Sequence, residues 1–297
     1  MSDNLYVGSH KGTNSNWRKG YDMTFGSGIL PGCRKSDKGD VDTHIEPSDE
    51  RKGGASPFSF ECPILTMDIM GRERSTMKTI GLIGGVSWTS TMEYYKRINE
   101  AAPSKILIYS FNHNEILDFQ INGNKKEESL LLTQAATSLF VAGAELIGVC
   151  SNTTSKNIET ARKNVSIPLI DIIEVSANKI NSMGIKKIGL LATIYTMESD
   201  AFSKFLPNVE IVLPNEQDRT LIHNVIYQEL CHNKVSNDSR KEFVRVINQM
   251  SKQSVELIVL GCTEIPLLIN QRDVDIPMMD TMQVHINAIM EEANAVG

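Results

Sequence analysis

The chain has 297 residues, of which 41 % are hydrophobic, and a formal net charge of −6. This length and apolar content suffice for one large globular domain or two medium-sized ones without stabilising cross-links. The acidic balance argues against nucleic-acid and anionic-membrane surfaces, which need clustered Lys and Arg, and no stretch approaches the roughly 20 apolar residues of a membrane span.

The cysteine pattern favours neither a disulfide framework nor a zinc or thiol-exchange site, because the number is odd and no C-x-x-C pair occurs. The first 20 residues lack the apolar run of a secretion signal. We therefore expect a reducing, cytoplasmic location and no metal. The five cysteines are Cys33, Cys62, Cys150, Cys231 and Cys262.

Residues 1–76 differ in composition from the rest of the chain. They are rich in Gly, Ser, Asp, Asn and Lys, and their apolar residues follow neither the strand nor the helix period. We predict that this segment is a disordered extension. Within it, the hydrophobic stretch SFECPILTMDIM is a candidate for a short docking element.

From residue 77 onward, short apolar runs alternate with amphipathic segments. Segments such as 128–144 and 240–255 carry apolar residues at helical spacing, whereas the short runs are typical of buried strands. This alternation predicts parallel sheets with crossover helices, which is an α/β fold. The eight expected strands cover residues 78–84, 105–111, 145–151, 167–172, 186–192, 209–214, 256–262 and 276–280.

Three motifs occur twice, in the same order. KTIGLIG recurs as KKIGLLA, ELIGVCSNT as ELIVLGCTE, and VSIPLID as VDIPMMD. The first two motifs start 67 residues apart in one half and 70 apart in the other. We therefore expect two similar α/β/α lobes with four-stranded parallel sheets, related by pseudo-twofold symmetry. The first lobe would contain residues 77–178 and 281–297, and the second residues 179–280.

The repeat indicates which polar residue faces the region between the lobes. Aligned without a gap, Ser151 and not Cys150 matches Cys262. Neighbouring side chains of a strand point to opposite faces, so we expect Cys150 to be a small buried hydrophobe. Both motifs end a strand before a helix, where α/β proteins bind ligands and where capping residues can hold a carboxylate.

This arrangement suits chemistry on the two faces of one carbon atom. One group can remove a proton from one face while another returns a proton to the opposite face. We expect Cys262 to be partly thiolate near neutral pH, because a helix N-terminus lowers the pKa of a thiol. A serine hydroxyl is a poor base, so the two faces should not be equivalent.

Residues 77–297 resemble the aspartate/glutamate racemase superfamily, and within it the aspartate racemase branch. The resemblance rests on MKTIGLIGGVSWTSTMEYYKRINE, GLLATIYTMESDAF, IYQELC, LGCTEIPLL and IPMMDTMQVH, which follow one another in the family's order. It implies two α/β/α lobes with an active site between them and a homodimer. It also implies a racemase of acidic amino acids that uses neither pyridoxal phosphate nor a metal.

The resemblance further implies which residues form the site. The family's two catalytic cysteines map onto Ser151 and Cys262, and Ser151 looks like a serine version of the threonine that some members carry there. The substrate-binding positions carried over by motif are Gln120, Asn152, Thr153, Thr193 and Thr263.

The chain departs from the family pattern at three places. Ser155 replaces a usual histidine, Ile194 replaces the arginine of a Gly-Thr-Arg-like turn, and Pro103 shortens the first helix. Two alternatives therefore stay open. One is a decarboxylase or isomerase of the same superfamily that uses a single cysteine, and the other is a non-catalytic protein that binds small carboxylates.

Other reactive residue types are expected to have structural roles. The histidines have no spacing that suggests a metal site, and we expect His285 to cap a helix or support the site indirectly. Cys231 is expected to pack on a helix, and the thirteen methionines to fill the core.

Overall fold

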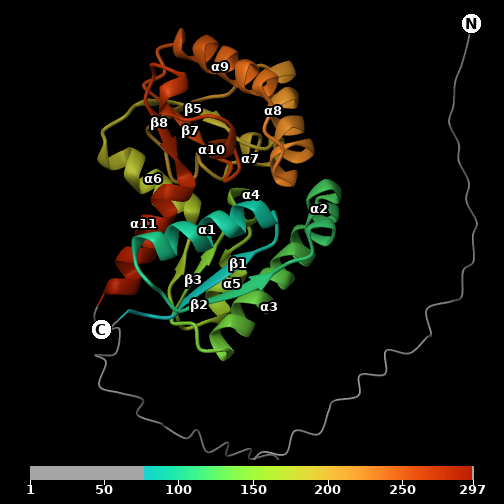
Figure 1. Ribbon diagram of the computed structural model, residues 1–297, viewed down its shortest axis with the longest axis vertical. Coiled ribbons are helices and arrows are strands. Elements are labelled where there is room, and N and C mark those ends of the chain that lie inside the picture. Colours follow the sequence, from blue (N-terminus) through green and yellow to red (C-terminus); the bar gives the residue numbers. More distant parts are fainter. Residues whose placement is uncertain (1–76, 296–297) are drawn as a thin grey trace, which may run out of the picture. The chain divides into compact units, whose positions relative to one another are not determined.

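The computed structural model describes residues 77–295 and contains two four-stranded parallel sheets (Figure 1). The strand order is β2-β1-β3-β4 in the first sheet and β6-β5-β7-β8 in the second. The predicted α/β fold with two similar parallel sheets is confirmed. The segment predicted to be a disordered extension, 1–76, lies outside the described residues.

Strands and helices of the first half alternate along the chain. Its strands are β1 (Ile80–Gly84), β2 (Ile106–Ser110), β3 (Leu146–Val149) and β4 (Leu169–Ile170). Its helices are α1 (Trp88–Ala101), α2 (His113–Asn122), α3 (Lys125–Val141), α4 (Asn152–Ser155) and α5 (Glu159–Asn164). As predicted, α1 ends just before Pro103.

The second half repeats this alternation. Its strands are β5 (Lys187–Leu191), β6 (Glu210–Val212), β7 (Leu257–Leu260) and β8 (Met278–Asp280). Its helical segments are α6 (Ile172–Ser182), α7 (Ile194–Met197), α8 (Glu216–Gln228), η1 (Leu230–His232), α9 (Asn237–Ser251), α10 (Ile265–Leu268), η2 (Gln271–Asp273) and α11 (Thr281–Asn294).

Strand alternation divides the side chains of the first sheet between two cores. Leu82 of β1 packs with apolar residues of α1 and α11, whereas Ile83 packs with those of α3 and α5. Both are fully buried, and each such side chain contributes about 1.5–3 kcal/mol relative to exposure. The second sheet follows the same rule, since Val259 packs with α6 and Ile258 with α8 and α9.

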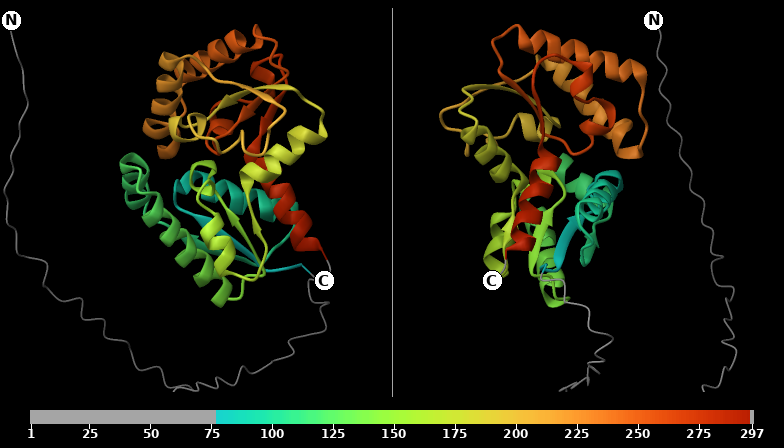
Figure 2. Two further views of the ribbon diagram at one scale, coloured as in Figure 1. Left: turned by 180° about the vertical axis from the view of Figure 1, so that it is seen from behind. Right: turned by 60° about the vertical axis from the view of Figure 1, so that its left-hand side comes forward.

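Two helices cross reciprocally between the halves. α6 follows the last strand of the first sheet, yet Ile173 and Ala177 pack in a core of the second sheet. α11 follows the last strand of the second sheet, yet Ile286 and Ile289 pack in a core of the first. The two further views in Figure 2 show α11 leaving the second sheet and running along the first.

This crossing changes one predicted boundary. The division predicted at residue 178 falls inside α6, whose apolar face is buried on the second sheet. We therefore propose that the second lobe begins at about Ile172. The sequence repeat could not indicate this boundary. A crossover helix belongs to the lobe whose sheet it packs against, and that sheet need not be the one whose strand it follows.

Within residues 77–295, no helix is both long enough and apolar enough to cross the hydrocarbon layer of a membrane.

Gly148 of β3 allows α11 to lie close to the first sheet. A Cβ atom at this position would come within 2.5 Å of Ile289 Cδ1. We predict that Gly148→Ala lowers the free energy of unfolding by about 1–3 kcal/mol through overpacking. Ile289→Val removes the opposing Cδ1 atom and should recover part of that loss in the double variant. Urea unfolding measures both, and purely additive losses would refute this account of the contact.

Candidate active site

The carboxyl ends of β3 and β7 meet at one cavity between the two sheets. Parallel strands present polar residues at this edge, where the chain turns into the next helix. The cavity is lined from both halves by Val86, Ser87, Cys150, Ser151, Asn152, Thr153, Thr193, Ile226, Tyr227, Cys231, Gly261, Cys262, Thr263 and Glu264. Six of the seven predicted site residues are therefore brought together, and Gln120 is not among them.

On the first side, Ser151 caps the short helix α4. Its hydroxyl oxygen accepts a hydrogen bond from the Thr154 backbone N–H at 3.3 Å. Two residues further on, the Thr153 hydroxyl lies 2.9 Å from that of Thr193, which follows β5 in the other half. A hydrogen bond between side chains of the two halves thus closes this side of the cavity.

Cys150 packs in a core, as expected, but it lines the cavity together with Ser151, whereas the strand alternation predicted that only one of the two would face it. Cys150 is 1 % exposed and packs with Leu82, Tyr94 and Met282 in the core of the first sheet. Burial there raises the pKa of its thiol. Cys150 contributes to the cavity wall, but its apolar contacts and raised pKa identify it chiefly as a core residue.

On the opposite side, Cys262 is paired with a carboxylate. Its Sγ donates to Glu264 Oε2 at 2.9 Å, and the Thr263 hydroxyl donates to the same oxygen, also at 2.9 Å. All three residues are buried. The carboxylate can therefore accept the thiol proton directly, and the neighbouring hydroxyl stabilises the carboxylate.

The expected thiolate character of Cys262 is not found. Burial raises the pKa of the thiol well above its ordinary value, and the negative charge of Glu264 raises it further. The helix that follows, α10, has only four residues and begins three positions later, so its dipole does not offset these effects. Cys262 therefore rests as a protonated thiol.

Besides Cys150, four residues of the cavity wall with polar or ionisable side chains were missed or assigned differently from the sequence. Cys231 lies on η1 and lines the cavity, so its role is not confined to the helix packing that was expected. Tyr227 and Ser87 carried no local signal, since they come from a long helix and from the loop after β1. Glu264 did carry a local sequence signal, because an acidic residue two positions after a cysteine at a strand end can accept the proton of the thiol.

Gln120 lies one contact away from the cavity. Its Nε2 donates to Glu128 Oε1 at 3.2 Å and to Thr154 Oγ1 at 3.3 Å. Its Oε1 accepts from the hydroxyl of Tyr227, a cavity residue, at 3.0 Å. Gln120 thus connects the wall of the cavity to α3, and direct contact with a substrate stays a prediction.

His285 supports the fold beside the site. It is fully buried, its Nε2 lies 3.0 Å from the Ile170 carbonyl oxygen, and its Nδ1 lies 2.7 Å from the Tyr94 hydroxyl. Because a carbonyl only accepts, Nε2 carries the proton and Nδ1 accepts from Tyr94. Burial lowers the pKa of the imidazole to about 4, so His285 is neutral at physiological pH.

The cavity is nearly closed in this conformation. Its free volume is about 20 Å³, enough for one water molecule but too small for an amino acid. Entry of a substrate therefore requires the two halves to move apart or side chains to withdraw. No Lys or Arg of the described chain lines this space, and within residues 77–295 no group of three His, Cys, Asp or Glu side chains is arranged to hold a metal ion.

Comparison with known proteins identifies relatives with the same architecture. The family profile described as Asp/Glu/hydantoin racemase matches residues 83–289. A Yersinia pestis protein assigned as an Asp/Glu racemase is 39 % identical with a TM-score of 0.67, and an aspartate racemase homologue from Pyrococcus horikoshii is 32 % identical with a TM-score of 0.62. Each alignment covers 74 % of this chain and all of the other.

Matches to curated proteins cover shorter segments. A glutamate racemase from Persephonella marina is 25 % identical over 152 residues, which are 49 % of this chain and 57 % of the relative. The chain spans about half of the length of the first curated relatives it matches.

The buried imidazole of His285 predicts a pH dependence of stability. Its pKa is about 4 in the folded protein and about 6.5 in an unfolded chain. The unfolded state therefore binds more protons between these values, and stabilisation of up to about 3 kcal/mol is lost as the pH falls from 6.5 towards 4. His285→Gln keeps a donor for the Ile170 carbonyl but cannot titrate.

Urea unfolding at several pH values between 4 and 7.5 tests this expectation. The stability of the wild type should fall more steeply towards low pH than that of His285→Gln. Burial raises the pKa of Asp171 to about 6, so this carboxyl group makes the protein more stable as the pH falls, the opposite of the effect of His285. Its contribution is the same in both proteins and therefore cancels when their stabilities are compared. Parallel curves would contradict the role of His285.

Proposed function

The chain belongs to the Asp/Glu/hydantoin racemase family, and on that premise we propose that it is a cofactor-independent racemase of aspartate or glutamate. One observation carries the proposal: a thiol paired with a carboxylate and a serine hydroxyl occupy the ends of corresponding strands at one closed cavity. Racemisation needs this arrangement, because the proton must leave and return on opposite faces of the α-carbon.

Neutral polar groups would bind the acidic substrate. The cavity offers the hydroxyls of Thr153, Thr193 and Thr263 and the amide of Asn152. No Lys or Arg of the described residues lines it, so the carboxylates of the substrate would be held by hydrogen bonds and not by ion pairs. Enclosure strengthens these bonds, since water does not compete for the same groups.

Cys262 and Glu264 would supply the acid and base on one face. The thiol proton passes to Glu264 Oε2 along the existing hydrogen bond, which leaves a thiolate. The thiolate takes the α-proton, and the electrons of the broken C–H bond remain on the carbanion. A proton delivered through Ser151, directly or from a water molecule, then forms the new C–H bond on the other face. When the product leaves, the oxygen that gave this proton takes one back from solvent and Glu264 releases the former thiol proton to solvent, which restores the resting site. The reverse direction uses the same groups in the opposite order.

Chemistry on a single face is the second candidate. The Ser151 oxygen already accepts from the Thr154 N–H, and the neighbouring thiol of Cys150 is buried in the core with a raised pKa. The first side of the cavity therefore offers no readily ionised group. This observation favours a decarboxylase or isomerase in which Cys262 alone delivers a proton to one face.

We further propose that the protein is cytoplasmic and acts as a homodimer. α1 supports association, because Trp88, Met92 and Tyr95 are spaced to lie on one face of the helix and are 57 %, 52 % and 45 % exposed. Exposed apolar side chains of this size are typical of surfaces that bind a protein partner.

Proton NMR in D₂O tests the reaction. The wild type should exchange the α-hydrogen of both enantiomers of aspartate or glutamate, and Cys262→Ser should lower the rate at least about 100-fold because the base is lost. Ser151→Ala should abolish racemisation, whereas Cys150→Ala should retain it. Exchange without inversion would favour the single-face reaction, and a wild type that exchanges none of the four amino acids would exclude the racemase.

Glu264→Gln should separate thiol ionisation from turnover. Loss of the negative charge lowers the pKa of Cys262, so alkylation of this residue by iodoacetamide, mapped by mass spectrometry, should become faster near pH 8. The α-hydrogen exchange should nevertheless fall at least about tenfold, because the proton acceptor is lost. Glu256→Gln, at the opposite end of β7, is the matched control. Slower or unchanged alkylation in Glu264→Gln would contradict the proposed pairing.

A further inference from the structure

The side-chain amide of Asn152 is only half satisfied. Asn152 begins α4 and lines the cavity. Its Nδ2 donates to Thr281 Oγ1 at 3.2 Å, whereas its buried Oδ1 has no hydrogen-bond partner among the described residues. A buried acceptor without a partner is costly, so a group of this kind in a binding cavity indicates that a ligand supplies the donor.

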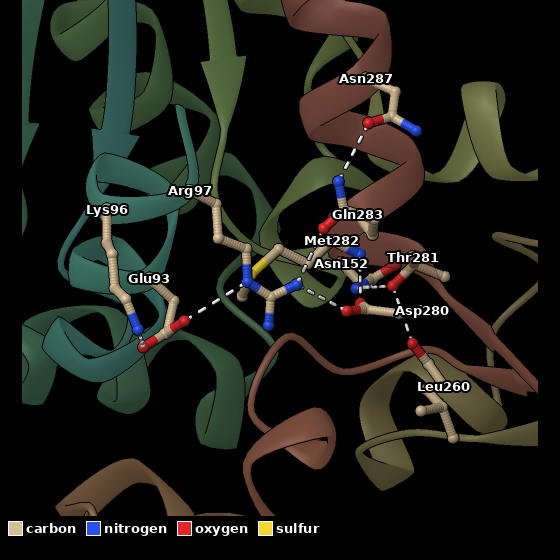
Figure 3. A network of polar contacts seen from close by, with 10 residues as sticks. All are labelled: Glu93, Lys96, Arg97, Asn152, Leu260, Asp280, Thr281, Met282, Gln283 and Asn287. Atoms are coloured by element: carbon tan, nitrogen blue, oxygen red, sulfur yellow. Dashed lines mark hydrogen bonds and ion pairs between the residues drawn. The ribbon is translucent and has the colours of Figure 1, made fainter. Parts of the chain in front are cut away.

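Thr281 determines which end of this amide is left free. The Thr281 hydroxyl donates to the Leu260 carbonyl oxygen at 2.8 Å, as Figure 3 shows. A hydroxyl has one proton, so Oγ1 offers only lone pairs to Asn152. The NH₂ end of the amide must therefore face Thr281, and Oδ1 is the end that remains without a partner.

Thr281 is itself held firmly at the start of α11. It is fully buried, and the preceding Asp280 caps the helix by accepting from the Met282 N–H at 2.9 Å. The other carboxylate oxygen of Asp280 accepts from Arg97 of α1, also at 2.9 Å (Figure 3). Leu260 ends β7, the strand that leads to Cys262. Thr281 therefore connects the amide on one side of the cavity to the strand that carries the thiol on the other.

We propose that Thr281 is a positioning residue that holds Asn152 Oδ1 as a fixed acceptor for the ammonium group of an α-amino acid. This inference rests on the proposed function and assigns the group that would recognise the amino group of its substrate. A dicarboxylate without an amino group leaves Oδ1 unpaired, whereas aspartate or glutamate supplies an N–H donor. The amide thus selects amino acids over plain dicarboxylates.

The positioning can be tested without substrate. In protein labelled with ¹⁵N at asparagine, the Asn152 side-chain NH₂ should exchange slowly with solvent, because one of its protons is held by Thr281. Thr281→Val has nearly the same shape but no acceptor, so this exchange should become at least about tenfold faster. Thr281→Ser keeps the hydroxyl and should preserve the protection. Equal protection in the wild type and Thr281→Val would overturn the inference whatever the activity.

The matched control is Thr133→Val. Thr133 on α3 also donates to a backbone carbonyl at 2.8 Å, that of Ser129, but it does not line the cavity. This variant loses the same kind of hydrogen bond and should leave both the protection of the Asn152 amide and the kinetics unchanged. A change equal to that in Thr281→Val would identify the effect as general destabilisation and overturn the inference.

Kinetics test the role of the free acceptor. Thr281→Val should raise KM for the amino acid about tenfold with little change in kcat, the loss expected for one hydrogen bond to a charged group. The inhibition constant of succinate, which has two carboxylates but no ammonium group, should not change. In an Asn152→Ala background, Thr281→Val should have no further effect on KM. The inference would be overturned if the inhibition constant of succinate also rose about tenfold in Thr281→Val. It would likewise be overturned if the effects of Thr281→Val and Asn152→Ala on KM were additive.

The two proposals fail separately. If the wild type exchanges no α-hydrogen, the racemase proposal fails, and the NMR protection still decides whether Thr281 holds the amide. If the wild type is active and Thr281→Val has an unchanged KM, only the inference about Thr281 fails.

Discussion

The geometry of the cavity depends on one helix that begins on one sheet and is buried on the other. α11 starts directly after β8, and its apolar face packs against the first sheet through Ile286 and Ile289. α6 makes the opposite crossing, since it follows the first sheet and packs on the second. Each sheet is therefore covered by a helix that follows the last strand of the other sheet. The relative position of the two strand ends is therefore set by close packing in two hydrophobic cores and not by the few polar contacts across the cavity.

Most of the fold was accessible from the sequence, because it depends on local periodicity and on an internal repeat. Strand geometry alone predicted that Cys150 packs in a core, although both Cys150 and Ser151 line the cavity. The repeat indicated Ser151 as the counterpart of Cys262. The boundary that we propose at α6 was not accessible in this way, since a helix can bury its apolar face on either neighbouring sheet. Contributions from η1 and from the loop after β1 were not predictable, because a cavity wall is assembled from segments that are distant in the chain.

The electrostatics of the site were the least predictable part. A thiol beside a helix N-terminus is expected to ionise easily, yet Cys262 lies next to a four-residue helix, is nearly excluded from solvent and faces a carboxylate. Burial and like charge outweigh a short dipole, which reverses the direction of the pKa shift. Sequence gives the neighbours of an ionisable group along the chain, but the depth of burial that decides its pKa comes from the assembled lobes.

The small free volume of the cavity has a kinetic consequence. A space of about 20 Å³ admits substrate only after an opening motion, so association should proceed more slowly than diffusion permits. In the proposed racemisation, the same enclosure would protect the carbanion, because bulk water is kept out while the α-carbon lacks a proton. Turnover would then be limited by how often the cavity opens, and the rate of this opening would influence the speed of the proposed reaction as much as its acid and base.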